Sequence, residues 1–238
     1  MTSSIPTNRP KAVLFDHDGV LVASEPLHWT AWELLFNELG LPYHENEIRA
    51  MVGKTAPQIL EETLNRYRPD WNQSSLIYDL EALAKRKNDY YLKEVIHRLQ
   101  PYPGVREGLE WLKNQNIRIA VVSNAKQREL TTALSLLKLD QYFDQIVSRD
   151  DTGKCKPDPT PYLFAAASLG CEPTECIAVE DSPTGLEAAL FAKIPVAAVE
   201  TNFSFEQLKY PVPGRLDLTP TWIGKNMSEF FHWMKACF

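Results

Sequence analysis

No stretch of this chain is long and apolar enough to cross a membrane, because every hydrophobic run falls short of the roughly 18 residues that a spanning helix needs. The first ten residues are polar and lack the apolar centre of a secretory signal, so we expect a loose polar leader there. Internal repeats and low-complexity tracts are also missing. These absences predict a protein without a membrane partner.

Cysteine is scarce, and none of the four cysteines forms a Cys-x-x-Cys pair or a zinc-binding spacing with histidine. The four are Cys155, Cys171, Cys176 and Cys237. A chain without a disulfide framework is typical of a reducing compartment, so we expect reduced thiols and a cytoplasmic location.

Positive charge is in deficit: 25 lysines and arginines face 31 aspartates and glutamates, which gives a net charge of −6. Such a balance argues against nucleic acid as a partner. It leaves room for a small anionic substrate, since a local cationic pocket can lie within an acidic surface. Aromatic residues near the C-terminus are expected to pack a terminal helix against the rest of the protein, so we favour a monomer, although the sequence does not define the oligomeric state.

The order of the predicted elements indicates two domains. From residue 101 onward, short apolar strands alternate with helices, which predicts a parallel sheet covered on both faces. Residues 25–100 contain helices and no convincing strand. We therefore predict an α/β fold, with a doubly wound parallel sheet from residues 11–24 and 101–238 and a second, smaller, all-helical cap domain from residues 25–100.

Hydrophobic spacing and cap residues define the individual elements. The predicted strands are Ala12–Phe15, Ile117–Val122, Phe143–Ser148, Cys176–Val179 and Val196–Val199. The predicted helices are Leu27–Leu39, Glu45–Val52, Ala56–Arg66, Leu76–Leu99, Val105–Asn114, Glu129–Lys138, Pro161–Leu169, Pro183–Ala192 and Asn226–Lys235. Thr160 is expected to cap the helix that begins at Pro161.

Polar groups follow three of the predicted strands. They are Asp16 and Asp18, Ser123 and Asn124, and Glu180 and Asp181. A lysine, Lys156, stands before a helix in the segment Lys-Pro-Asp-Pro. Each group taken singly has an ordinary structural explanation, such as a turn, a helix cap or a solvated lysine. Two carboxylates after a buried strand nevertheless require a cationic partner.

Taken together and in order, these residues resemble the four motifs of the haloacid dehalogenase (HAD) superfamily. Asp16-His-Asp18-Gly19 resembles motif I, Ser123 motif II, Lys156 motif III, and Glu180-Asp181 motif IV. The resemblance runs from about Lys11 to the C-terminus and implies a Rossmann-like core. The dehalogenases of this superfamily lack the second aspartate and use no metal, so Asp18 and Asp181 favour phosphoryl transfer.

The resemblance also implies roles for these residues. Asp16 is expected to attack phosphorus and form an aspartyl phosphate, and Asp18 to act as general acid and then base. Ser123, Asn124 and Lys156 are expected to bind the charge of the transferring group. Mg²⁺, a hard cation that prefers oxygen ligands, is expected on Asp16, Asp18, Glu180 and Asp181, with Asp18 ligating through its main-chain carbonyl.

The helical insertion resembles the C1-type cap of the β-phosphoglucomutase branch and of related sugar-phosphate phosphatases. Lys87 and Asn88 match a pair of substrate-contacting residues in that branch, and His28 matches a histidine that hydrogen-bonds the general acid. Lys126 matches a basic residue just after motif II. A solvated helix face remains the alternative for Lys87.

Two positions depart from that branch. Ala56 stands where the mutases carry an arginine that grips the second phosphate, and Lys54 could replace it only as a point charge. Ala23 stands where many relatives have an aspartate at the hinge into the cap, which places the hinge geometry in doubt.

We therefore predict a Mg²⁺-dependent phosphatase of a small phosphorylated metabolite, most simply a sugar phosphate. A β-phosphoglucomutase-type phosphomutase is the alternative, since it would share all of the core chemistry. A binding protein without catalysis is a third reading, but such a protein is expected to have lost Asp16, Asp18 or Lys156.

Overall fold

The computed structural model describes residues 9–51, 54–72 and 78–238. The chain divides into two compact units, one formed by residues up to Ala23 together with Gln100–Phe238 and the other by Ser24–Leu99. The sequence-based boundaries lie at 24/25 and 100/101. Of the two units, the first is the core unit and the second is the helical unit.

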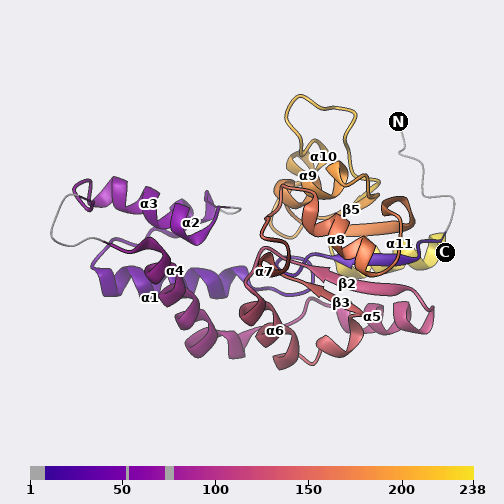
Figure 1. Cartoon of the computed structure of the whole chain (residues 1–238), viewed down its shortest axis with the longest axis horizontal. Helices are drawn as coiled ribbons and strands as arrows, with labels where there is room; N and C mark the ends of the chain where they lie inside the picture. The colour runs from indigo at the N-terminus through magenta and orange to yellow at the C-terminus, as the bar shows by residue number, and fades with distance from the viewer. Residues whose placement is uncertain (1–8, 52–53, 73–77) are drawn as a thin grey trace. The chain divides into compact units, whose positions relative to one another are not determined.

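The core unit is built on one six-stranded parallel sheet with the strand order β3-β2-β1-β4-β5-β6 (Figure 1). The strands are β1 (Ala12–Phe15), β2 (Arg118–Val122), β3 (Gln145–Val147), β4 (Cys176–Glu180), β5 (Val196–Val199) and β6 (Trp222–Gly224). The chain winds outward from β1 to β3, returns to the other side of β1 and winds outward again to β6. This arrangement confirms the prediction of a doubly wound α/β core.

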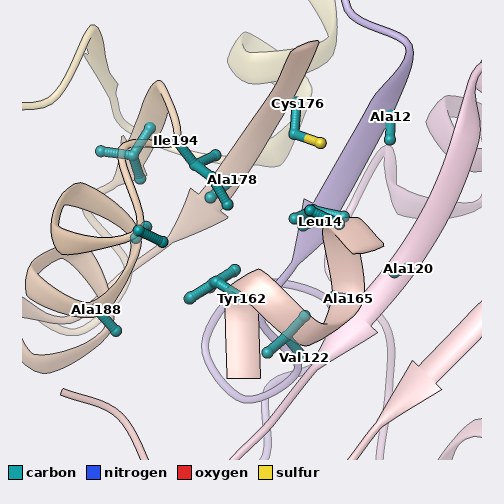
Figure 2. Close-up of a cluster of buried hydrophobic side chains, with 14 of the residues drawn as sticks. Ala12, Leu14, Ala120, Val122, Tyr162, Ala165, Cys176, Ala178, Ala188 and Ile194 are labelled. Atoms are coloured by element: carbon teal, nitrogen blue, oxygen red, sulfur yellow. The ribbon is translucent and has the colours of Figure 1, made fainter. Parts of the chain in front are cut away.

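Alternate residues of β1 face opposite sides of the sheet. Ala12 and Leu14 belong to a fully buried cluster with Tyr162 and Ala165 of α8 (Thr160–Ser168) (Figure 2). Phe15 packs on the other side against Phe230 of α11 (Met227–Cys237), with ring centroids 6.0 Å apart. Both faces of β1 are therefore covered, as its unbroken apolar sequence requires.

Five further helices and two short 3₁₀ turns complete the core unit within the described residues. The helices are α5 (Val105–Asn114), α6 (Gln127–Leu136), α7 (Arg149–Thr152), α9 (Pro183–Phe191) and α10 (Phe205–Lys209), and the turns are η3 (Asp140–Tyr142) and η4 (Pro173–Glu175). The prediction that Thr160 caps its helix is wrong. Thr160 is the first helical residue, and its amide donates to the Asp158 carboxylate at 2.9 Å, so the acid two residues upstream receives that amide.

The described part of the helical unit contains α1 (Glu25–Leu39), α2 (Glu45–Arg49), α3 (Ala56–Tyr67) and α4 (Leu80–Tyr90). Its own apolar core is formed by α1, α2, α3 and α4, with Trp32, Leu35 and Leu60 buried. Thr55 caps α3 in a reciprocal capping box with Gln58. Val52, Gly53 and the predicted helix start at residues 76–77 lie outside the described residues.

The prediction of one continuous helix up to Leu99 is wrong. The α-helix ends at Tyr90 and continues as a π-helical turn, η1 (Tyr91–Val95), followed by a 3₁₀ turn, η2 (Ile96–Arg98). Composition rich in Ala, Leu, Lys and Glu favours helix but does not distinguish these helix types. In neither unit is any helix of the described residues long and apolar enough to span a bilayer.

The aromatic packing under β1 gives a stability prediction. Phe230 is fully buried and its ring contacts those of Phe15, Phe231 and Trp222, so Phe230→Ala should lower the free energy of unfolding by about 3–5 kcal/mol. Phe205→Ala is the matched control, because that ring is 40% exposed and its loss should cost no more than about 0.5 kcal/mol. Urea unfolding of both variants measures the difference, and equal midpoints would contradict the packing argument.

Candidate active site

The polar groups that follow the strands meet at one place on the sheet. Asp16 follows β1, Ser123 follows β2, and Glu180 and Asp181 lie at the end of β4. Because β1 lies between β2 and β4 and all three strands are parallel, their carboxyl ends lie at the same edge. This is the point where the strand order reverses, which is the usual ligand site of an open α/β sheet.

The Lys156 side chain connects the ends of three strands. Its ammonium donates to Asp16 Oδ1 at 2.6 Å, to Glu180 Oε1 at 2.7 Å and to the main-chain carbonyl of Val122 at 2.8 Å. Burial alone would lower the pKa of Lys156, but the carboxylates of Asp16 and Glu180 raise it above its ordinary value. The lysine is therefore a permanent cation held by three fixed acceptors, and its side chain is only 4% exposed.

Asn124 holds the backbone of this lysine. The amide of Lys156 donates to Asn124 Oδ1 at 2.8 Å, and Asn124 Nδ2 donates back to the Lys156 carbonyl at 3.2 Å. Beside it, the buried Ser123 hydroxyl accepts from the amide of Ala125 at 3.0 Å. Asn124 was predicted as a binding residue, and the structure shows that its side chain joins the loop after β2 to the loop that carries Lys156.

Glu180 is completely buried and its position is fixed on several sides. Oε1 accepts from the Tyr162 hydroxyl at 2.6 Å as well as from Lys156. A Cβ at Gly185 in α9 would lie 2.0 Å from the Glu180 carboxylate, so only glycine fits there. Burial, together with the charge of Glu180, raises the pKa of Tyr162 well above its usual value, so the phenol stays a donor.

Asp181 is held by a loop that the motifs do not include. Asn202 Nδ2 donates to Asp181 Oδ2 at 2.7 Å, and the Thr201 hydroxyl lies 3.3 Å from the same oxygen. Thr201 also donates to the carbonyl of Gly19 at 2.6 Å. Sequence reasoning missed Tyr162, Thr201 and Asn202, and the only available signal was that the latter two follow a predicted strand.

Asp16, Glu180 and Asp181 form a group that could hold a cation, since each can offer one carboxylate oxygen and these oxygens lie within 4.8 Å of one another. The three carboxylates carry three negative charges when ionised, and Lys156 supplies one positive charge, so two negative charges remain. Burial raises the pKa of Asp16 to about 7; Lys156 opposes this rise, and Glu180 and Asp18 add to it. A hard divalent cation prefers oxygen ligands and carries the two positive charges that would neutralise this group.

Asp18 does not join that carboxylate group within the described residues. Its Oδ1 lies 3.1 Å from Nδ1 of His17, whose ring is buried and lacks an aligned hydrogen-bond partner among the described residues. Burial alone would lower the pKa of His17, and the neighbouring Asp18 raises it above its usual value. The Asp18 side chain is 31% exposed, so it can reach solvent or a ligand.

Lys126 and Ala23 are the remaining residues of the core unit that the sequence analysis singled out. Lys126 is the N-cap residue of α6 and is half-buried. Ala23 is half-buried, and its amide donates to the carbonyl of Gln100 at 3.2 Å. Within the part of the chain that the structure describes, no contact of Lys126 or Ala23 assigns either residue a chemical role.

The predicted residues of the helical unit form two separate groups. Lys87 is buried, its ammonium lies 2.7 Å from Nδ1 of His28, and the His28 ring stacks on Tyr91 at 4.2 Å. Lys54 instead binds Glu62 through both carboxylate oxygens at 2.7 Å. The half-buried Asn88 follows Lys87 in α4, and Ala56 is the first residue of α3.

Comparison with known proteins gives a consistent result. Residues 13–199 match the family model described as haloacid dehalogenase-like hydrolase. A phosphorylated carbohydrates phosphatase of Thermotoga maritima is 35% identical over 77% of this chain and 82% of its own length. A phosphoglycolate phosphatase of Pseudomonas syringae pathovar tomato is 30% identical over 88% and 81%. Among solved structures, a candidate β-phosphoglucomutase of Thermotoga maritima aligns with a TM-score of 0.75 and 30% identity, over 96% of this chain and 100% of that chain.

The raised pKa of Asp16 predicts that cation binding depends on pH. A protonated carboxyl is a poor ligand, so a proton competes with the cation below about pH 7. The apparent affinity for Mg²⁺ should therefore fall as the pH falls, approaching about tenfold per pH unit below pH 6. Isothermal calorimetry with MgCl₂ from pH 5.5 to 8 measures this dependence.

Asp217→Asn serves as the control, because that exposed carboxyl is held by Arg215 at a pKa of about 2 and does not titrate in this range. The control should retain the full pH dependence. An affinity that is constant between pH 5.5 and 8 in the unmodified protein would contradict the assignment of Asp16 as a ligand.

Proposed function

Because this chain belongs to the haloacid dehalogenase-like hydrolase family and is a phosphoric monoester hydrolase of small phosphorylated molecules, we propose that it dephosphorylates a sugar phosphate with Mg²⁺ through an aspartyl phosphate on Asp16. One observation carries the proposal. Asp16, Glu180 and Asp181 each offer a carboxylate oxygen within 4.8 Å of the others, Lys156 contacts Asp16 and Glu180, and two negative charges remain, which one divalent cation would neutralise. A purely structural ion-pair group gains nothing from such an excess of negative charge.

Asp16 is the proposed nucleophile. Its Oδ1 accepts a hydrogen bond from Lys156 at 2.6 Å, which holds the carboxylate in a fixed direction and opposes the rise of its pKa caused by burial. Mg²⁺ bound by Asp16, Glu180, Asp181 and the main-chain carbonyl of Asp18 would neutralise the repulsion between the carboxylate and a phosphate dianion. Lys156 and the Ser123 hydroxyl then stabilise the charge on the transferring group.

Asp18 is the proposed general acid and base. It first protonates the departing alkoxide and later removes a proton from the water that hydrolyses the aspartyl phosphate. The two aspartates have different surroundings: Asp16 is 13% exposed and held by Lys156, whereas Asp18 is 31% exposed and adjoins His17. Such a difference supports two separate roles for neighbouring carboxyl groups.

A sugar phosphate is the proposed substrate class. The support is the 35% identity to a phosphatase of phosphorylated carbohydrates over most of both chains. Phosphoglycolate is the competing substrate, since a relative at 30% identity is named for it. We keep Lys87, Asn88, His28, Lys126 and Lys54 as proposed substrate contacts from the sequence.

A reducing, cytoplasmic location and a monomeric state complete the proposal. Its support is that all four cysteines are free and that Phe230 and Phe231 of the terminal helix are buried within their own unit.

A phosphomutase is the second candidate, favoured by the contact between Lys87 and His28 and by the 30% identity to a candidate β-phosphoglucomutase. Two features weigh against it. Ala56 replaces the expected arginine, and the Lys54 ammonium is bound to Glu62. The mutase would differ only in which hydroxyl, that of water or that of a sugar, reaches the phosphorylated aspartate.

Replacing the nucleophile tests the mechanism. Asp16→Asn should reduce kcat for a phosphomonoester by more than about a thousandfold, because an amide does not form the acyl phosphate. Phosphate release from p-nitrophenyl phosphate with saturating Mg²⁺ measures the loss, and Asp217→Asn on the exposed loop is the control of equal charge change. Retention of more than a tenth of the activity would exclude Asp16 as the nucleophile.

A paired assay separates the two candidate functions. β-Glucose 1-phosphate, Mg²⁺ and a trace of β-glucose 1,6-bisphosphate are supplied, and glucose 6-phosphate and free phosphate are both followed. We expect phosphate release on this or another sugar phosphate, with phosphoglycolate tested in parallel. Formation of glucose 6-phosphate without equivalent phosphate would instead establish the mutase.

A further inference from the structure

We propose that Thr201 and Asn202, on the loop between β5 and α10, are positioning residues that hold the metal ligand Asp181 and tie it to the turn after β1. The proposal rests on the metal site of the proposed function. Both residues lie beyond residues 13–199, which the family model matches. Neither was a candidate from the sequence.

The hydrogen bonds assign a different task to each residue. Asn202 Nδ2 donates to Asp181 Oδ2 at 2.7 Å, which is the distance of a strong bond to a carboxylate. The Thr201 hydroxyl has one proton and two acceptors in reach, the Gly19 carbonyl at 2.6 Å and Asp181 Oδ2 at 3.3 Å. The shorter contact takes the proton, so Thr201 fixes the turn and Asn202 fixes the carboxylate.

Close packing at Gly19 supports the same arrangement. Gly19 has a φ of +80°, and a Cβ built on it would lie 2.1 Å from Asp181 Oδ2 and 2.6 Å from Asn202 Nδ2. The Asp181 carboxylate and the Asn202 amide are therefore packed directly against the turn that follows Asp16 and Asp18. A shift of the loop would move Asp181 relative to that turn.

The base of the loop is itself fixed. The amide of Glu200 donates to the carbonyl of Gly224 at 2.9 Å, which continues the pairing of β5 with β6. The Glu200 carboxylate accepts from the Lys225 ammonium at 2.9 Å and from the amide of Phe205 at 3.1 Å. Thr201 and Asn202 thus project from a segment that is anchored on both sides.

Neutral donors suit this position for an electrostatic reason. Three carboxylates whose oxygens lie within 4.8 Å repel one another, so Asp181 needs a donor to keep its direction before a cation arrives. The Asn202 amide supplies a hydrogen bond to Asp181, and the Thr201 hydroxyl supplies one to the adjoining turn, without cancelling the charge. A second lysine in their place would neutralise the site and compete with Mg²⁺.

Isosteric substitutions test the proposal in the full-length protein. Asn202→Leu should weaken Mg²⁺ binding by about tenfold or more, as is usual when a partner of a metal ligand is lost, and Thr201→Val by a smaller factor. Thr201→Ser retains the hydroxyl and should bind Mg²⁺ as the unmodified protein does. Asn114→Leu and Thr132→Val make the same chemical changes on exposed helix surfaces of the core unit and serve as controls.

Two readouts are needed. Calorimetry with MgCl₂ alone gives the affinity, and hydrolysis of p-nitrophenyl phosphate at rising Mg²⁺ concentration gives the half-saturating Mg²⁺ and kcat. We expect the half-saturating concentration to rise with the dissociation constant, and kcat at saturation to change by a smaller factor. A role in folding alone would lower the urea midpoint without changing Mg²⁺ affinity, and that result would overturn the proposal.

Asp181→Asn separates the failure of this inference from the failure of the proposed function. If Asp181→Asn binds Mg²⁺ like the unmodified protein, the metal site itself is wrong. If Asp181→Asn loses binding while Asn202→Leu and Thr201→Val retain it, only the positioning role is wrong. Should Asn202→Leu fail to fold, the comparison of Thr201→Val with Thr201→Ser decides the question.

Discussion

The buried ammonium of Lys156 is the constraint on which the site depends. Burying an unpaired charge is very costly, and Lys156 is almost completely buried, so its three acceptors must all be in place. Two of them, Asp16 and Glu180, come from the ends of β1 and β4, and the third is the last carbonyl of β2. A parallel register of these three strands is therefore a condition for a stable lysine, and the lysine in turn fixes the direction of the Asp16 carboxylate.

The same charge balance explains why the site suits phosphate chemistry. One ammonium contacts the carboxylates of Asp16 and Glu180, so two of the three negative charges remain when Asp181 is included, and burial together with the charges of Glu180 and Asp18 raises the pKa of Asp16. A divalent cation held by these oxygens would neutralise the remaining negative charge and would reduce the repulsion of a phosphate dianion. The same arrangement of charges therefore stabilises the buried lysine and suits a phosphate substrate. Tyr162 and Gly185 pack against the Glu180 carboxylate on the buried side of the site.

Sequence reasoning identified the groups whose chemistry is visible in their residue type. Asp16 and Glu180 follow apolar runs and Lys156 precedes a helix, in a recognisable order, and the alternation of strands and helices was enough to predict the doubly wound α/β core. Tyr162 and Asn202 were missed because they act through other side chains and their contacts span 18 and 21 residues of sequence. The break at Tyr90 was missed because helix propensity does not distinguish an α-turn from a π-turn.

Ala56 alone does not decide between phosphatase and mutase. A second phosphate bound by Lys54 would have to displace Glu62, and an exposed lysine–glutamate pair contributes only about 0–1 kcal/mol, so that exchange is inexpensive. What such a lysine lacks is the planar fork of arginine, which fixes the orientation of a bound phosphate. A mutase needs that orientation because its intermediate must turn and offer its other end, whereas hydrolysis requires only that water reach Asp16. Without the arginine fork a second phosphate would be poorly oriented, and this favours the phosphatase. How tightly a second phosphate could bind distinguishes the two functions less well.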